Sequence, residues 1–299
     1  MSQTLSPSAK QPYGLARVCR VWALARSTVY ATQKRVATPE RPQARRGPKT
    51  QWTDAALTEQ IREVLGASPF LGEGHRKVWA RLRVRGVRTS KARALRLMRE
   101  ADLLAPTRVG RAHGPAAHDG TIITDRPDVM WGTDATSCVT RLEGMATVFI
   151  AVDHCSAECI GIHAAKYGTR FEALEPLRQG VREAFGEYGV ATAQGLRLRH
   201  DHGSQYMSDH FQAELAFLGI ESSPAFVREP EGNGCAERFI RTLKEQLLWV
   251  RTFDTVEELR IALLAFKERY NREWLIERHG HQTPAAIRSA YTAAIGAAA

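Results

Sequence analysis

The sequence has few cysteines, and they are dispersed. Only five of its 299 residues are Cys, and no two of them form a C-x-x-C pair. Scattered thiols in odd number argue against the disulfide framework of a small secreted domain. His154, Cys155, Cys159 and His163 could superficially ligate zinc. They fall in two expected strands and their turn, where thiols are usually core residues, so we favour a structural role for all four.

The sequence also lacks a long apolar run. Its best run, "ATVFIAV" at residues 146–152, has the length of a strand, whereas a membrane span needs roughly 18 apolar residues. The N-terminal "MSQTLSPSAKQ" has no apolar segment of the kind found in secretory signals. We therefore expect a cytosolic protein without a membrane partner.

Acidic residues are scarce in the first part of the chain. Residues 1–127 contain 24 Lys and Arg against 9 Asp and Glu. Residues 128–299 contain 18 Lys and Arg against 23 Asp and Glu. The overall composition, 43% hydrophobic and 25% charged, is that of a globular protein. A basic segment of this size attracts polyanions by releasing their counterions. Nucleic acid is the leading partner, and a merely solvated basic surface is the alternative.

Two short helical patterns open the chain. Residues 14–35 contain two apolar-periodic stretches with a short break between them, and Ser27 or Thr28 could cap the second. This layout predicts a helix-turn-helix, with a plain helical hairpin as the alternative. We therefore expect a helix-turn-helix-like segment at 1–37, followed by a basic linker at 38–50 that is rich in Pro and Arg.

A second helical module is predicted at residues 51–105. The stretch "DAALTEQIREVLGAS" is followed by "GEGHRKVWARLRVRG" and "SKARALRLMREADLL", with Ser90 as the N-cap of the last helix. We expect Leu95 and Met98 on the inner face of that helix, because basic side chains cover the rest. Such helices suit a phosphate backbone or a major groove. The predicted DNA contacts here are Arg76, Lys77, Lys91, Arg93, Arg96 and Arg99.

The pattern changes after a Gly- and Pro-rich linker at residues 106–127. Three strand-like runs, "VMWGTDATSCVT", "MATVFIAVD" and "ECIGIHAA", are followed by alternating helical and strand patterns. These are a helix at 170–188, a strand "LRLRHD", a helix at 209–218, a short strand near Ile220 and a helix from Cys235. We predict an α/β layered domain at 128–250 with a helical tail at 251–299.

Three carboxylates fall where a site is expected in such a domain. Asp134 lies on the first strand, Asp201 at the end of the fourth, and Glu237 on the following helix, with 35 residues between the last two. Hard cations such as Mg²⁺ take oxygen ligands, and two ions about 3.5–4 Å apart can activate an attacking hydroxyl and stabilise a leaving oxygen. The trio predicts in-line phosphoryl transfer. Asp153 also ends a strand, but we interpret it as a turn residue.

The motifs "TDAT", "DHGSQY" and "GNGCAERFIRTLK" resemble the DDE catalytic core of the retroviral-integrase superfamily. More closely, the chain resembles the OrfB product of insertion sequences of the IS-three type. The similarity covers most of the chain, since "VCRVWALARSTVY", the helices from "GEGHRKVWARL" to "SKARALRLMREADLLAP" and "YNREWLIERHGHQTPAAI" match further family motifs in the same order.

The resemblance implies an RNase H-like core, with a mixed five-stranded sheet flanked by helices, preceded by small all-α helix-turn-helix modules. It implies a DNA transposase or integrase with Asp134, Asp201 and Glu237 as catalytic ligands of Mg²⁺ or Mn²⁺, two ions in number. Lys244 matches a basic position that contacts DNA, and Arg241 could contact DNA or pair with Glu237. Asn233 matches the approach to the catalytic helix and is a further expected DNA contact.

The resemblance also implies partners. These are the DNA of element ends and target, further copies of the chain assembled on that DNA, and an OrfA partner or fusion. The expected location is the bacterial cytosol or nucleoid. Two other functions stay open: a DNA-binding regulator with an inactive core, and a nuclease that cuts without joining.

Overall fold

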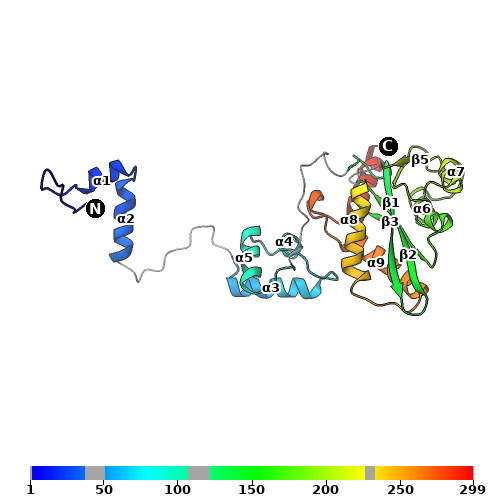
Figure 1. Ribbon diagram of the computed structural model, residues 1–299, viewed down its shortest axis with the longest axis horizontal. Helices are drawn as coiled ribbons and strands as arrows, with labels where there is room; N and C mark the ends of the chain where they lie inside the picture. Colours follow the sequence, from blue (N-terminus) through cyan, green and yellow to red (C-terminus); the bar gives the residue numbers. More distant parts are fainter. Residues whose placement is uncertain (1, 38–50, 107–121, 226–232, 299) are drawn as a thin grey trace. The chain divides into compact units, whose positions relative to one another are not determined.

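The computed structural model describes residues 2–37, 51–106, 122–225 and 233–298 (Figure 1). The chain forms two compact units, Met1–Gln51 and Trp52–Ala299. The first contains helices α1 (Leu15–Val21) and α2 (Arg26–Ala37). Helix α2 begins before Ser27 and Thr28, so the prediction that one of them caps it was wrong, and both lie in its first turn.

The second unit begins with three helices, α3 (Asp54–Ala67), α4 (His75–Val84) and α5 (Lys91–Glu100). Ser90 caps α5 as expected, because its hydroxyl accepts a hydrogen bond from the Arg93 N–H at 3.1 Å. Apolar side chains of the three helices and their connections form a small core of their own: Leu57, Ile61, Val64, Val78, Leu82, Val87, Leu97 and Met98.

A mixed sheet of five strands follows. The strands are β1 (Met130–Thr140), β2 (Gly144–Asp153), β3 (Cys159–Ala165), β4 (Arg197–His200) and β5 (Glu221–Pro224), in the order β3-β2-β1-β4-β5. The pairs β1–β2 and β2–β3 are antiparallel, while β1–β4 and β4–β5 are parallel. The predicted RNase H-like α/β fold is thereby confirmed.

Helices flank both faces of this sheet (Figure 1). Alternate residues of β2 point to opposite faces. Phe149 and Ala151 pack with α6 (Arg170–Phe185) and α7 (Asp209–Leu218). Val148, Ile150 and Val152 pack with α8 (Gly234–Leu243), its π-helical continuation (Lys244–Leu248) and α9 (Val256–Glu273). The chain then forms a short 3₁₀ turn (Glu277–His279) and helix α10 (Pro284–Ala298).

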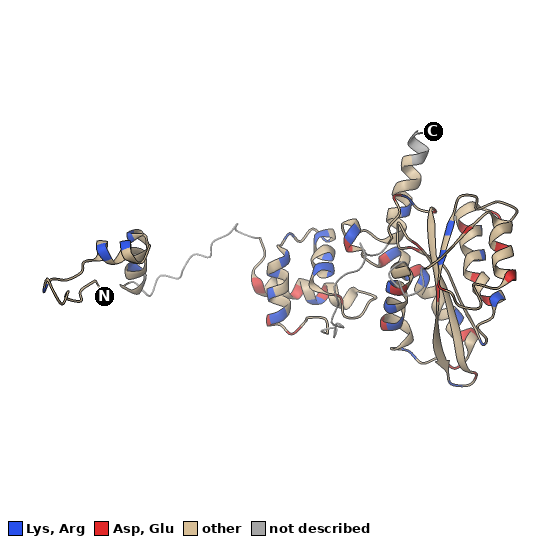
Figure 2. Ribbon diagram, turned by 45° about the horizontal axis from the view of Figure 1, so that its top comes forward, with Lys and Arg blue, Asp and Glu red and all other residues tan. Residues whose placement is uncertain are grey.

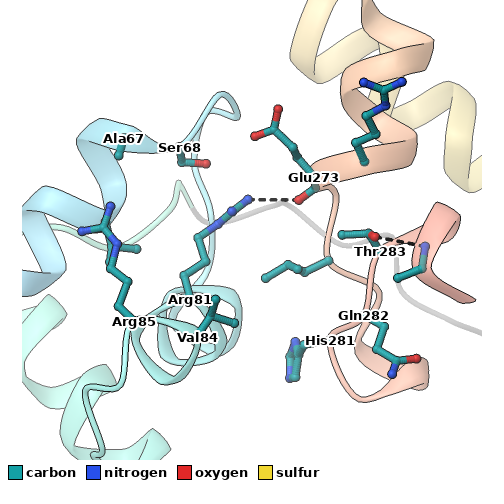
Figure 3. Close-up of a pocket in the computed structure, with 13 residues that line it drawn as sticks. Ala67, Ser68, Arg81, Val84, Arg85, Glu273, His281, Gln282 and Thr283 are labelled. Carbon is teal, nitrogen blue, oxygen red and sulfur yellow. Dashed lines mark hydrogen bonds between the residues drawn. The ribbon is translucent and has the colours of Figure 1, made fainter.

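The loop between α3 and α4 packs on the sheet domain. Phe70 is buried in the cluster beneath α8 and α9, edge-on to Trp274 with ring centroids 4.9 Å apart. The backbone of Leu71 exchanges two hydrogen bonds with the Gln246 side chain, at 2.8 and 2.9 Å. Beside this contact, Arg81 donates to the Glu273 carbonyl at 3.2 Å, along a pocket of about 370 Å³ that Figure 3 shows. The helical module and the sheet domain are therefore joined by direct contacts.

Among the described residues, none of the helices combines the length and the apolar character needed to cross a bilayer.

Candidate active site

The register between β1 and β4 determines where the first two carboxylates lie. The parallel ladder pairs Met130 with Arg197, Trp131 with Leu198 and Gly132 with Arg199. Asp134 and Asp201 each follow two residues after this last pair. Because side chains alternate along a strand, residues two apart share a face. Asp134 on β1 therefore shares the face of Gly132, and Asp201, the first residue after β4, is close enough for its charge to raise the pKa of Asp134.

That face is the one covered by α8. Asp134 lies opposite Ile150 in the β1–β2 ladder, and Ile150 belongs to the core cluster beneath α8 and α9. As predicted, helix α8 and its continuation bury the apolar stripe of Phe239, Leu243 and Leu247. Glu237 is exposed at the flank of this stripe. Burial of one helix face thus leaves Glu237 available at the same side of the sheet as Asp134.

The pKa of Asp134 records the proximity of the other charges. Burial raises its pKa from 3.8 to about 6, and the negative charges of Asp201 and Glu237 add to the effect. The Ala135 N–H, which donates to the Asp134 carboxylate at 2.7 Å, and the Lys244 ammonium act in the opposite direction. Electrostatic interactions of this size require nearby charges, so the three predicted carboxylates and Lys244 share one region.

The turn after β4 orients Asp201. Its carboxylate accepts a hydrogen bond from the Gly203 N–H at 2.8 Å, and Asp201 itself is exposed. Tyr206 closes the turn as a fully buried side chain, with ring centroids 5.7 Å from His200 and 5.4 Å from Phe211. Sequence reasoning assigned no role to Tyr206. The available signal was its place in "DHGSQY", directly after a strand-end carboxylate.

Asp153 is the turn residue that the sequence indicated. It is fully buried, and one carboxylate oxygen accepts bonds from the Ser156 N–H at 2.7 Å and the Ser156 hydroxyl at 2.8 Å. The other oxygen accepts from the Asp128 N–H at 2.9 Å. Both oxygens are thus committed to the loop structure.

The three remaining residues predicted near the carboxylates lie on α8 or directly at its ends: Asn233 is its N-cap, Arg241 is within it, and Lys244 begins its π-helical continuation. Arg241 is exposed one turn after Glu237, and Lys244 is partly buried. Asn233, expected to contact DNA, is only 5% exposed and donates a hydrogen bond to the Thr133 carbonyl at 2.9 Å. The structure therefore brings Asn233 to the strand that carries Asp134.

Two predicted DNA contacts on α5 form ion pairs inside the helical module. Arg93 donates to the Asp54 carboxylate and to the Trp52 carbonyl, both at 2.7 Å. Arg96 pairs with Asp54 at 2.8 Å and with Glu100 at 2.9 Å. These bonds hold α5 on the start of α3. The inner face of α5 also differs from expectation: Met98 is buried as predicted, but Ala94 and Leu97 accompany it and Leu95 is partly exposed.

The other four predicted contacts lie on α4 and α5, whose ribbons carry many of the Lys and Arg positions that Figure 2 colours blue. Arg76 pairs with Glu277 at 2.7 Å, and the Lys77 ammonium lies over the Trp274 ring. Both therefore reach the sheet domain. Lys91 lies 4.6 Å from the Trp79 ring centroid, and Arg99 is exposed on the last turn of α5.

The donor set fits a hard divalent cation, which prefers carboxylate oxygens, water and phosphate. Asp201 and Glu237 are exposed, so phosphate and water could reach them. Burial is the main cause of the raised pKa of Asp134, and the charges of Asp201 and Glu237 add to it. Across the described ranges, no three His, Cys, Asp or Glu side chains already surround one point as metal ligands do. The three carboxylates are thus the right type of ligand for a divalent cation, and they would have to move closer together to bind one ion jointly.

Two family models match segments of the chain, and named transposases are similar to most of it. Residues 218–284 match the family described as Integrase core domain, and residues 51–111 match the family described as HTH-like domain. The transposase for insertion sequence element IS629 of Shigella sonnei is 26% identical over 296 residues, covering 96% of this chain and 95% of that protein. Transposase InsD for insertion element IS2D of Escherichia coli (strain K12) is 28% identical over 243 residues, and the match covers 79% of this chain and 78% of that protein.

Solved structures to which the chain is similar include the HTLV-2 integrase catalytic core domain in complex with magnesium. It has a TM-score of 0.41 and 18% identity, and the match covers 55% of this chain and 98% of that one. The resemblance stated from the sequence is confirmed by the two family matches and the two transposases. Two segments of the chain thus match the HTH-like and Integrase core family models, and the chain as a whole is similar to insertion-sequence transposases.

Proposed function

We propose that this chain is a DNA transposase that cuts a phosphodiester at an element end and joins the resulting 3′-OH to target DNA. The named transposases among its homologues, and the polynucleotidyl transferase activity expected of an integrase core, support this function. One observation carries the proposal: Asp134 and Asp201 each lie two residues beyond the last β1–β4 pair, and the charges of Asp201 and Glu237 both act on the Asp134 carboxylate.

In this proposal Asp134, Asp201 and Glu237 hold two Mg²⁺ or Mn²⁺ ions. When bound, such ions activate an attacking oxygen and stabilise the leaving oxygen of a phosphodiester. Asp134 contributes in its deprotonated form, which predominates above its pKa of about 6. The exposed positions of Asp201 and Glu237 leave room for a DNA strand.

Two displacements account for the products. In the first, a water oxygen bonds to phosphorus, the bond from phosphorus to the 3′ oxygen breaks, and that oxygen leaves as a 3′-OH. In the second, this 3′-OH attacks a target phosphodiester, and the displaced target oxygen takes up a proton. Arg241 and Lys244, one and two turns after Glu237, supply positive charge for the phosphates on both sides of the reacting group.

The HTH-like domain would position the element end, because its basic helices suit DNA backbone. Transposases and integrases bind DNA and assemble as multimers, so we propose that copies of this chain assemble on the element ends. An OrfA partner or fusion would add to end recognition.

The test uses the full chain with labelled element-end DNA, a target plasmid and Mg²⁺ or Mn²⁺. Asp134→Ala, Asp201→Ala and Glu237→Ala are compared with wild type, and Asp209→Asn, an exposed carboxylate at the start of α7, is the matched control. We expect joined products from wild type and the control, and none from the three variants, with DNA binding retained.

The same assay separates the alternatives. Cleaved but unjoined ends would indicate a nuclease, and DNA binding without either product would indicate a regulator. Metal-independent products, or full activity in any of the three Ala variants, would overturn the proposed site.

A further inference from the structure

Asn233 uses its side chain differently from an ordinary helix cap. It is the N-cap of α8, and an Asn there usually accepts a hydrogen bond from an N–H of the first helical turn. The Asn233 side chain makes no such capping bond. Asn233 is only 5% exposed, so its polar side chain needs a partner inside the protein. Its amide instead donates to the Thr133 carbonyl of β1, 2.9 Å away. A favourable local bond is replaced by a bond to a distant strand.

The acceptor lies beside the first carboxylate. Thr133 precedes Asp134 and is one residue beyond the last β1–β4 pair. It is fully buried, and its hydroxyl donates to the Ile150 carbonyl at 2.8 Å. The Asn233 bond therefore reaches β1 at the point where its parallel ladder with β4 has ended, while its antiparallel ladder with β2 continues.

Gly132 makes this contact possible. A Cβ atom on Gly132 would lie 2.7 Å from the Asn233 side-chain oxygen and 2.8 Å from Nε2 of His154. Real Cβ atoms essentially never approach so closely, and both neighbours are buried. The φ angle of Gly132 is not in the left-handed region. Glycine is thus required here for space, so that the start of α8 can approach β1.

We propose that Asn233 is a positioning residue that fixes α8 on β1 and so holds Glu237 in place relative to Asp134. Glu237 follows Asn233 by four residues, about one helical turn, and Asp134 is bonded to Thr133. One buried hydrogen bond thus joins the two backbone segments that carry these carboxylates. The inference rests on the proposed metal site, since convergence of the carboxylates is what it serves.

The test compares two buried asparagines in the full chain. Asn271 is 6% exposed and joins α9 to β3, donating to the Cys159 carbonyl and accepting from the Cys159 N–H, both at 2.9 Å. Asn271→Ala therefore removes similar bonds on a different strand. Mn²⁺ affinity is measured by calorimetry without DNA for wild type, Asn233→Ala, Asn271→Ala, Asp134→Ala and Glu237→Ala. Thermal unfolding and DNA affinity are measured in parallel.

Residues that orient metal ligands typically contribute roughly 10- to 100-fold to metal affinity. We expect a loss of that size in Asn233→Ala, with DNA affinity retained, and wild-type Mn²⁺ affinity in Asn271→Ala despite its lower unfolding temperature. Gly132→Ala should weaken Mn²⁺ binding as well. Its effect should be smaller in the Asn233→Ala background, because one of the two atoms that meet the new Cβ is then gone.

Wild-type Mn²⁺ affinity in Asn233→Ala, or an equal loss in Asn271→Ala, would overturn the positioning role. If Asp134→Ala and Glu237→Ala lose Mn²⁺ binding while Asn233→Ala keeps it, only this inference fails. If none of these variants changes Mn²⁺ binding, the metal site and the positioning role fail together.

Discussion

Gly132 and Arg199 are the last paired residues of the parallel β1–β4 ladder, and Asp134 and Asp201 follow them at the same spacing. The folding of the sheet thereby forces two carboxylates together. Their repulsion, with burial as the larger effect, appears as the raised pKa of Asp134. The protein holds this unfavourable arrangement through the packing of the two helical layers around it.

Asp134→Asn should stabilise the metal-free protein in a pH-dependent way. The folded-state pKa is about 6, above its value of 3.8 without these neighbours, so the unfolded chain loses its proton first as the pH rises. Stability should therefore fall between about pH 4 and pH 6, by about 2–3 kcal/mol at most. Asp134→Asn removes this fall, so it should unfold at a higher temperature than wild type at pH 7.5 and at about the same temperature at pH 4.

Thermal unfolding in EDTA across this range is the measurement. Asp209→Asn, at an exposed position, should follow the wild-type curve. Equal pH dependence in wild type and Asp134→Asn would show that the carboxylate has an ordinary pKa.

Divalent cations should reverse this destabilisation. An ion that binds only the folded state raises the free energy of unfolding by about 2.7 kcal/mol at 100 times its Kd. Binding needs the deprotonated carboxylate, so the stabilisation by Mn²⁺ should grow as the pH rises through about 6. Differential scanning calorimetry with and without Mn²⁺ measures it. An equal gain in Asp134→Ala would locate the bound ion elsewhere.

Regular elements were predictable from the sequence because their signals are local. The helix at Asp209–Leu218 was expected at the bounds it has, and the three antiparallel strands follow alternating or continuous apolar runs. The carboxylates were recognisable as a set because strand ends and their order along the chain are visible in the sequence. The closeness of Asp134 and Asp201 follows from the β1–β4 register, which depends on pairing between distant segments.

Side-chain roles that depend on tertiary contacts were not predictable in this way. Asn233 was expected to contact DNA, yet its partner Thr133 lies 100 residues away. Arg93 and Arg96 were predicted to contact DNA, and nothing local in the sequence indicates that they pair with Asp54 at the start of α3. The π-helical turn at Lys244–Leu248 had no sequence signal, because the apolar spacing there also suits an α-helix.

Arg93→Ala and Arg99→Ala should therefore separate stability from DNA binding. Arg93 has an 18% exposed side chain and three bonds to Asp54 and Trp52, so its loss should lower the free energy of unfolding by about 1–3 kcal/mol. Arg99 is exposed, and its loss should change stability by less than about 0.5 kcal/mol. If Arg99 contacts a phosphate, Arg99→Ala should reduce the slope of log affinity for DNA against log salt concentration by roughly one, because about one fewer counterion is released on binding.

Chemical denaturation and DNA titration at several salt concentrations provide both readouts. A stable Arg93→Ala variant with weakened DNA binding would assign Arg93 to the DNA surface instead.

Two glycine substitutions should have opposite effects on stability. A Cβ atom on Gly161 of β3 would lie 1.9 Å from the Pro176 carbonyl oxygen of α6, a backbone atom that can move only with its helix. Gly161→Ala should thus displace α6 and cost about 3 kcal/mol or more. In contrast, a Cβ atom on Gly66 in α3 meets nothing within 4 Å, so Gly66→Ala should stabilise that helix by about 0.5–1 kcal/mol. Urea unfolding of both variants measures the difference, and a wild-type midpoint for Gly161→Ala would mean that α6 does not approach β3 this closely.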